Sequence, residues 1–247
     1  MNGAITSTSD PRARVRHPLA FAALCVAIVG AVAVTSVGAR NAKVLGKTRH
    51  TPDPVCPKNC EAVGSVTGFQ RVADGQKQPF RVRRDGKIVA WAIDLSRPKK
   101  SQRRFFGDIF ESHRYGTKPT ARISVLKHKS RRKYKLLRQS PAVQLSGSLG
   151  DKQVFTLNQP LRIRRGNIVA LTVPTWASAF AVGLSRRGNK WRGSRTKPNC
   201  SPKSQSTRDV RRFARASRPQ QKVGSVREYG CDYETARLLY WAYYVPD

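Results

Sequence analysis

The chain contains one pattern twice: PFRVRRDGKIVAW at residues 79–91 returns as PLRIRRGNIVAL at residues 160–171. In each copy apolar and basic residues alternate, a turn containing glycine follows, and an apolar run rich in β-branched residues comes next. Alternation with a period of two is typical of a half-buried strand, and a short turn between two such runs is typical of a hairpin. Each copy therefore predicts two strands joined by a tight turn. The two copies together predict a β-sandwich or a β-barrel.

The rest of the chain continues this β pattern. Short apolar runs, spaced by roughly ten residues, lie between turns rich in glycine and proline, which is typical of a sandwich. The last run, at 237–245, is apolar on both faces and predicts a central closing strand. We therefore expect an all-β fold, a jelly-roll-like antiparallel β-sandwich over residues 56–247, preceded by an N-terminal signal or anchor helix.

Two stretches interrupt the strand pattern. Residues 96–119 mix basic and aromatic residues with glycine and proline, and predict a long loop whose phenylalanines tuck under the sandwich. Residues 186–222 carry many basic residues, scattered glycines and prolines, and few apolar ones. This composition predicts a long, mobile basic loop.

Residues 1–39 have the features of an export signal. Basic residues precede an uncharged apolar run, and Val37-Gly38-Ala39 suits cleavage after Ala39. The run at 18–37 also approaches the length of about 20 residues that a bilayer needs, so a retained membrane anchor stays open. Because the basic flank comes first, both alternatives place the following residues outside the cytoplasm. We expect an exported protein, extracellular or at the cell surface, in which residues 40–55 form a polar linker.

The most unusual feature of the composition is its charge. Lys and Arg number 48 against 14 Asp and Glu, which gives a formal net charge of +34. A surface that serves only solubility usually mixes both signs and keeps the net charge of a small domain at about 2–8. A field of one sign attracts polyanions. We expect an anionic cell-envelope polymer or a lipid surface as the partner, with a polysaccharide as another candidate and nucleic acid as a weaker one for an exported protein.

Two groups of basic residues form the candidate polyanion-binding site. The duplicated pattern places a pair of arginines at each turn, and a cationic hairpin tip is expected at 127–135. A pseudo-symmetric fold would gather the four turn arginines on one edge, with the hairpin tip extending the patch. The candidate residues are Arg83, Arg84, Arg131, Arg132, Lys133, Arg164 and Arg165.

A carbohydrate-binding module is an alternative, because exposed aromatic rings supply flat apolar area for stacking on sugars. The candidate rings are Trp176 and Trp191. Trp191 lies between Lys190 and Arg192 in a polar stretch, so we expect it to be exposed. A non-specific extracellular nucleic-acid binder and a structural surface protein without a specific ligand are further alternatives.

The sequence offers no convincing catalytic constellation, and we expect a protein without enzymatic activity. The acids near aromatic residues would have their pKa values lowered by the surrounding cations, which hinders a general acid. His113 lies beside Ser112 and Glu111 in one loop, and adjacent residues seldom reach the geometry of a triad. Because neither an acidic cluster nor a Cys/His set has the spacing of metal ligands, we expect neither a metal nor another cofactor.

Four cysteines lie outside the apolar run: Cys56, Cys60, Cys200 and Cys231. An even number in an oxidising compartment predicts two disulfides, for which three connectivities are possible. The spacing of Cys56 and Cys60 is not that of a thioredoxin-like redox pair. We expect structural Cys56–Cys60 and Cys200–Cys231 bridges, the second of which would close the long basic loop.

Several short motifs resemble an uncharacterised family of exported bacterial β-sandwich proteins. They are VTGFQ at 66–70, the two Arg-Arg turns, LTVPTWA at 171–177, YGC at 229–231 and TARLLY at 235–240. The resemblance covers roughly residues 56–246, and the segment around Trp176 is its most specific part. It implies a β-sandwich and export, and it implies no activity.

Overall fold

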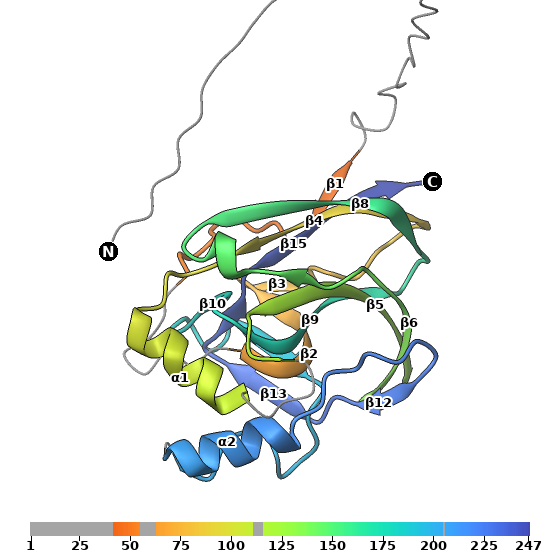
Figure 1. Cartoon of the computed structure of the whole chain (residues 1–247). Helices are drawn as coiled ribbons and strands as arrows, with labels where there is room; N and C mark the ends of the chain where they lie inside the picture. Colours follow the sequence, from red (N-terminus) through yellow and green to blue (C-terminus); the bar gives the residue numbers. More distant parts are fainter. Residues whose placement is uncertain (1–41, 55–62, 111–115, 205) are drawn as a thin grey trace, which may run out of the picture. The chain divides into compact units, whose positions relative to one another are not determined.

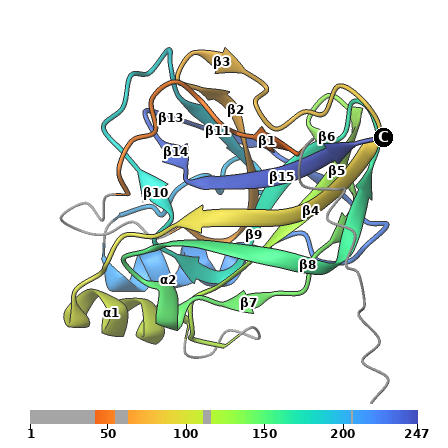
Figure 2. The same ribbon diagram turned by 90° about the horizontal axis from the view of Figure 1, so that it is seen from above.

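The computed structural model describes residues 42–54, 63–110, 116–204 and 206–247, and it shows a mostly β protein with curled antiparallel sheets (Figure 1). The smaller sheet has four strands in the order β1 (Lys43–Leu45), β15 (Tyr240–Pro246), β4 (Gly86–Asp94) and β8 (Lys152–Ile163). Figure 2 shows β15, β4 and β8 side by side. The closing strand expected at the C-terminal end is therefore confirmed, with β15 between β1 and β4.

The larger sheet is built around β9 (Ile168–Ala177), which pairs with β5 (Thr120–Ser130) on one side and β2 (Val63–Ala73) on the other. Outward from β5 lie β6 (Lys133–Gln139) and β12 (Val226–Glu228), and outward from β2 lie β11 (Lys190–Gly193) and β13 (Cys231–Glu234). The short strands β3 (Gln76–Lys77) and β7 (Val143–Gln144) pair with β2 and β5. A separate small sheet joins β10 (Phe180–Ala181) to β14 (Arg237–Leu238).

The main core is formed by side chains of the four-stranded sheet and of the larger sheet. Trp91 and Ile93 of β4 belong to the same buried cluster as Ile123 of β5 and Leu171 of β9. This follows from the period of two, which sends every second side chain of a strand to one face. The basic hairpin expected at 127–135 is confirmed as the β5–β6 hairpin.

The duplicated pattern does not form two hairpins. In the second copy the expected strands are β8 and β9, but they belong to different sheets. In the first copy only β4 forms, and Arg81 makes an isolated bridge to Ile168. The copies pair with each other instead, because Gly86 and Ile88 of β4 lie opposite Ile163 and Leu161 of β8. The hairpin interpretation was wrong because each turn carries the chain from one sheet to the other.

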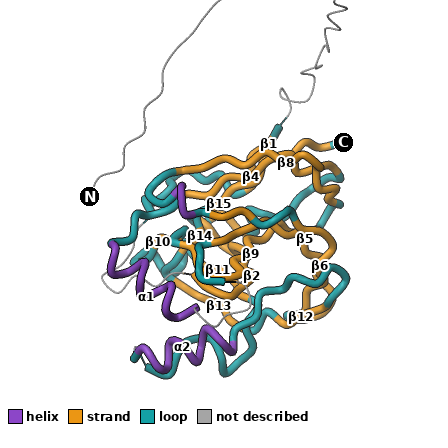
Figure 3. Tube along the Cα trace, in the orientation of Figure 1, coloured by secondary structure: helices purple, strands orange, loops and turns teal. Residues whose placement is uncertain are grey.

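Two helices occupy stretches that the sequence predicts to be loops. They are α1 (Lys100–Phe110) and α2 (Thr207–Ala216), and they lie next to each other beside the strands (Figure 3). Their apolar faces bury Phe106, Ile109 and Ala214 around the indole of Trp176. The expected burial of Phe106 is thus confirmed, but 186–222 is not one long loop, because β11 and α2 both fall within it.

The N-terminal part of the described chain is also more ordered than expected. Residues 40–55 were predicted to be a linker, yet β1 pairs with β15. The side chain of Arg237 donates hydrogen bonds to the carbonyl oxygens of His50 (2.9 Å) and Gly46 (3.2 Å). The signal or anchor at 1–39 lies outside the described residues. No helix in the described parts of the chain has the length and apolar character needed to cross a membrane.

One of the two predicted disulfides is confirmed. Cys200 and Cys231 are bonded and so tie the segment before α2 to the start of β13. Cys56 and Cys60, like Glu111, Ser112 and His113, lie outside the described residues.

Candidate anion-binding groove

The candidate site lies on the face of the larger sheet that points away from the main core. Along β9, Val169 and Leu171 enter the main core, whereas Ala170 between them belongs to a second cluster with Phe69, Tyr134 and other residues. The rings of Phe69 and Tyr134 meet edge to face, with centroids 5.1 Å apart. These rings give the outer face of the sheet an apolar floor.

A pocket of about 250 Å³ opens over this floor, and we call it the inner pocket. Phe69, Tyr134 and Ile168 contribute its apolar surface. Its basic lining consists of Arg71, Arg81, His128, Arg131 and Arg192, and its remaining residues are Gln70, Gln78 and Gly166. The inner pocket therefore combines an apolar floor with a cationic rim.

A second pocket of about 390 Å³, the outer pocket, adjoins the first. Its lining consists of Lys77, Gln78, Arg81, Val82, Arg83, Arg165 and Gly166. Gln78, Arg81 and Gly166 line both pockets, so the two form one continuous depression, which we call the arginine groove. Asp and Glu are absent from the residues that line it in the described chain, so the groove presents cations without a carboxylate among them.

The pairing of the two sequence copies positions the outer pocket. The amide of Val82 donates to the carbonyl of Asn167 (3.0 Å), and the amide of Gly166 donates back to the carbonyl of Val82 (2.9 Å). The amide of Arg165 donates to the carboxylate of Asp85 (2.7 Å). These bonds hold one turn against the other and bring Arg83 and Arg165 to the same pocket.

A hydroxyl group of the C-terminal strand fixes the first turn further. The Tyr244 hydroxyl lies within hydrogen-bond distance of the carbonyl oxygens of Arg84 (2.8 Å) and Asp85 (2.9 Å). Gly86 fits below them only because it has no side chain, since a Cβ there would lie 2.3 Å from the carbonyl oxygen of Val245. The small sheet thus supports the turn that carries Arg83.

The β5–β6 hairpin supplies the other end of the groove. Arg131, at its tip, has a positive φ of 44°. The Nε2 atom of His128 lies 2.9 Å from the carbonyl oxygen of Arg131, and the His128 ring lies 5.1 Å from that of Tyr134. His128, near the end of β5, and Arg131, in the turn, both line the inner pocket.

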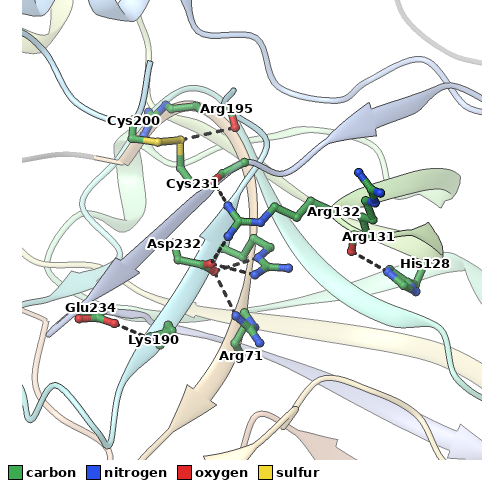
Figure 4. A network of polar contacts seen from close by, with 12 residues as sticks. Arg71, His128, Arg131, Arg132, Lys190, Arg195, Cys200, Cys231, Asp232 and Glu234 are labelled. Atoms are coloured by element: carbon green, nitrogen blue, oxygen red, sulfur yellow. Dashed lines mark hydrogen bonds and ion pairs between the residues drawn. A yellow bond between two sulfur atoms is a disulfide. The ribbon is translucent and has the colours of Figure 1, made fainter. Parts of the chain in front are cut away.

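A single carboxylate, that of Asp232, organises the wall behind the inner pocket (Figure 4). Arg192 donates to it from Nε and Nη2, both at 2.8 Å. Arg71 and Arg132 approach it at 3.5 and 3.8 Å. The Arg192 side chain is only 9% exposed, whereas that of Arg71 is 44% exposed. Arg192 is therefore held by the protein, and Arg71 keeps donors directed at solvent.

The pKa values of this group follow from the same contacts. Burial alone would raise the pKa of Asp232, but the hydrogen bond and charge of Arg192, with the charges of Arg71 and Arg132, lower it below the ordinary value of 3.8. Burial opposes the charge of Arg192 too, yet the bond to Asp232 raises the pKa of its guanidinium. The carboxylate stays ionised at neutral pH and neutralises one of three adjacent arginines.

The structure brings together only part of the predicted site. Arg83, Arg131 and Arg165 line the arginine groove, whereas Arg84, Arg164 and Lys133 line neither pocket. Arg132 turns toward Asp232 and donates to the carbonyl oxygen of Gly230 (2.6 Å).

Four basic residues of the groove were not predicted from the sequence: Arg71, Lys77, Arg81 and Arg192. Arg81 could have been found, because it alternates with Arg83 on one face of the repeated pattern. The sequence around Arg71 and Arg192 does not indicate a site, because these residues come together only through the pairing of β2 with β11.

The expectation that Trp191 is exposed is wrong. Trp191 and Trp176 are each 2% exposed. Trp191 stacks on Tyr233 at a centroid distance of 4.1 Å, and Gly68 makes room for it, because a Cβ there would lie 2.8 Å from the indole. Polar neighbours were misleading because β11 sends Lys190 and Arg192 to one face and Trp191 to the other. The indole nitrogen of Trp176 donates to the carbonyl of Thr117 (2.8 Å), so neither ring offers a surface for stacking on a sugar.

Comparisons with protein-family models, with curated proteins and with solved structures found no match to this chain.

Proposed function

We propose that this chain is an exported, non-catalytic protein that binds anionic groups of cell-envelope polymers or lipid head groups in the arginine groove. The observation that carries the proposal is the continuous depression lined by Arg71, Lys77, Arg81, Arg83, Arg131 and Arg165 without a carboxylate among its lining residues. Guanidinium groups bind phosphate and carboxylate through paired hydrogen bonds, and they are less strongly hydrated than ammonium groups. A concave surface of one charge sign also concentrates anions near it.

The construction of the groove supports a dedicated site over a diffuse surface charge. Its cations come from five separate places: the end of β2 with β3, the two copies of the repeated pattern, the β5–β6 hairpin, and β11. Backbone hydrogen bonds hold the two turns together. The side chain of Arg81 is also oriented by its bond to Gln78 (3.0 Å), and a side chain that is oriented before binding loses less freedom on binding than a mobile one.

Three finer expectations belong to the same proposal. A jelly-roll-like sandwich is compatible with two larger antiparallel sheets that share one core. Export, whether through a cleaved signal at 1–39 or a retained anchor, agrees with the Cys200–Cys231 disulfide, because such bonds persist in oxidising compartments. The resemblance to exported β-sandwich proteins stays a prediction.

The test is co-sedimentation of the protein with isolated cell envelopes over a salt series. A triple variant, Arg81→Gln with Arg83→Gln and Arg165→Gln, removes three groove cations. The matched control, Arg103→Gln with Arg104→Gln and Arg208→Gln, removes the same charge from exposed positions on the helices. Because one charge-assisted hydrogen bond is worth about 1.5–3 kcal/mol, we expect the groove variant to lose at least about tenfold in affinity and the control much less.

Competitors identify the mode of binding. We expect binding to fall steeply with salt, as phosphate binding by cations does, and to resist neutral polysaccharide. Free DNA as a competitor shows whether any polyanion suffices. If both triple variants lose the same affinity, binding depends on the overall surface charge and not on the groove. Binding that persists in high salt would also contradict the proposal.

A further inference from the structure

The two pockets of the arginine groove differ in chemistry. The outer pocket is lined by basic residues, Gln78, Gly166 and one valine. The inner pocket has the apolar floor of Phe69, Tyr134 and Ile168. A charged group placed against that floor would lose hydration on the side that faces the apolar residues, so charge is favoured in the outer pocket and beside the arginines of the inner rim. The floor of the inner pocket suits an uncharged unit.

Arg81 stands at the junction of the two pockets. Its guanidinium donates from Nη1 to the side-chain oxygen of Gln78 (3.0 Å), which orients it. On the other side lies Gly166, where a Cβ would come within 3.6 Å of Arg81 Nη2. Gly166 has a φ of +83°, a conformation that favours glycine, and the backbone therefore passes close to the guanidinium without a side chain between them. This leaves the junction open for an anion.

The cations around the junction favour phosphate over carboxylate. Arg81 and Arg83 come from one copy of the repeated pattern and Arg165 from the other, so they reach an anion from different sides. A carboxylate accepts hydrogen bonds in one plane, as Asp232 does from Arg192. A tetrahedral phosphate offers acceptor oxygens in several directions, which matches donors on separate segments.

The inner pocket sets the size of the neighbouring unit. Its volume of about 250 Å³ lies just below the range of about 300–1,000 Å³ that is usual for small-molecule sites. A sugar ring or a short polyol presents C–H groups to an apolar floor and hydroxyl groups to a polar rim. Arg71 and Gln78 lie at that rim to receive the hydroxyl groups.

We propose that the groove recognises a phosphodiester in which phosphate alternates with a sugar or a polyol, with the phosphate at Arg81 and the uncharged unit in the inner pocket. This inference rests on the proposed function and narrows its ligand class. The same chemistry occurs in polyol-phosphate polymers and in glycerophosphate lipid head groups, so the experiment has one arm for each source.

The first arm compares two soluble chains of matched charge, poly(glycerol phosphate) and inorganic polyphosphate, by calorimetry with the full chain at moderate salt. We expect the polyol-containing chain to bind roughly tenfold more tightly, which is the discrimination that a pocket contact of this size supplies. The second arm uses vesicles of phosphatidylglycerol or of phosphatidic acid in a neutral lipid. A preference for phosphatidylglycerol assigns the site to head groups, and a preference restricted to the soluble polymer assigns it to a polymer.

Two variants fill the inner pocket without removing any arginine. Ile168→Phe and Phe69→Trp each enlarge the apolar floor, one from β9 and one from β2, so the second stays informative if the first destabilises the sheet. We expect both to abolish the preference for poly(glycerol phosphate) and to leave polyphosphate binding within about twofold. Polyphosphate binding without any preference would overturn this inference alone. Failure of every anion to bind would overturn the proposed function and the inference with it.

Discussion

At the scale of single residues, the carboxylate of Asp232 determines the charge behind the inner pocket. It binds Arg192 in a bidentate pair and attracts Arg71 and Arg132 from greater distances. Removing it would leave the nearly buried Arg192 without its acceptor, and an unsatisfied charged group is costly. It would also release positive charge toward the groove. Asp232 therefore stabilises the folded protein but weakens the binding of anions in the groove.

We expect Asp232→Asn to lower the free energy of unfolding at pH 7 by about 1–3 kcal/mol, as measured by urea denaturation. The same change should tighten polyanion binding, because one negative charge beside Arg71 and Arg132 is lost. Glu234→Gln is the matched control, since Glu234 is the acid that pairs with Arg186 and Lys190 away from Asp232. Stability that is unchanged in Asp232→Asn would show that Arg192 is held by other contacts.

The pH dependence of Asp232 follows from the direction of its shift. Its pKa in the folded protein lies below the ordinary value of 3.8. The carboxylate therefore contributes stability that is complete above about pH 4 and is lost as the pH falls through the lowered pKa. Between pH 7 and pH 3 the native protein should lose more stability than Asp232→Asn does. Parallel losses would contradict this assignment.

At the scale of elements, periodicity predicted strands such as β4, β8 and β9 in the repeated pattern, and the basic hairpin of β5 and β6. It did not predict how they pair, because the partners of the repeated pattern lie about eighty residues apart. The two helices were missed because the basic residues, glycines and prolines in and around their segments are typical of loops. Strand β1 was missed for another reason. Its segment is held by pairing with β15 and by hydrogen bonds from the buried Arg237. These partners lie near the C-terminal end of the chain, so the sequence of residues 40–55 alone does not indicate them.

Arg237 is therefore a test of how the N-terminal segment is held. Burial lowers the pKa of its guanidinium, and its two donated bonds end on carbonyl oxygens of Gly46 and His50. We expect Arg237→Gln to speed amide hydrogen exchange in residues 43–50 by at least about tenfold, because the segment would open locally without global unfolding. The exposed Arg83→Gln provides the control. Exchange that accelerates equally in β5 and β9 would show that Arg237 supports the whole fold instead.

At the scale of the whole molecule, composition predicted an affinity for anions but could not place the site. Of the seven predicted cations, three line the groove, because chain reversal at two turns and one hairpin brings them together. The other four line neither pocket. The total charge is nevertheless a property of the entire chain, and it should also affect stability. Cations held close together in the folded state repel one another more than they do in the expanded unfolded chain.

We therefore expect salt to stabilise this protein. With 48 basic and 14 acidic residues, repulsion outweighs attraction, and the ion pairs among the described residues use only Asp209, Asp232 and Glu234. Most of these pairs include an exposed side chain and are each worth about 0–1 kcal/mol, so their screening costs little.

Raising NaCl from about 0.01 M to 1 M shortens the Debye length from about 30 Å to 3 Å. Calorimetry should show Tm rising by at least about 3 °C, the equivalent of roughly 1 kcal/mol. The helix variant with three arginines replaced should show a smaller rise, because it starts with less repulsion, and a Tm that falls with salt would mean that the few ion pairs dominate.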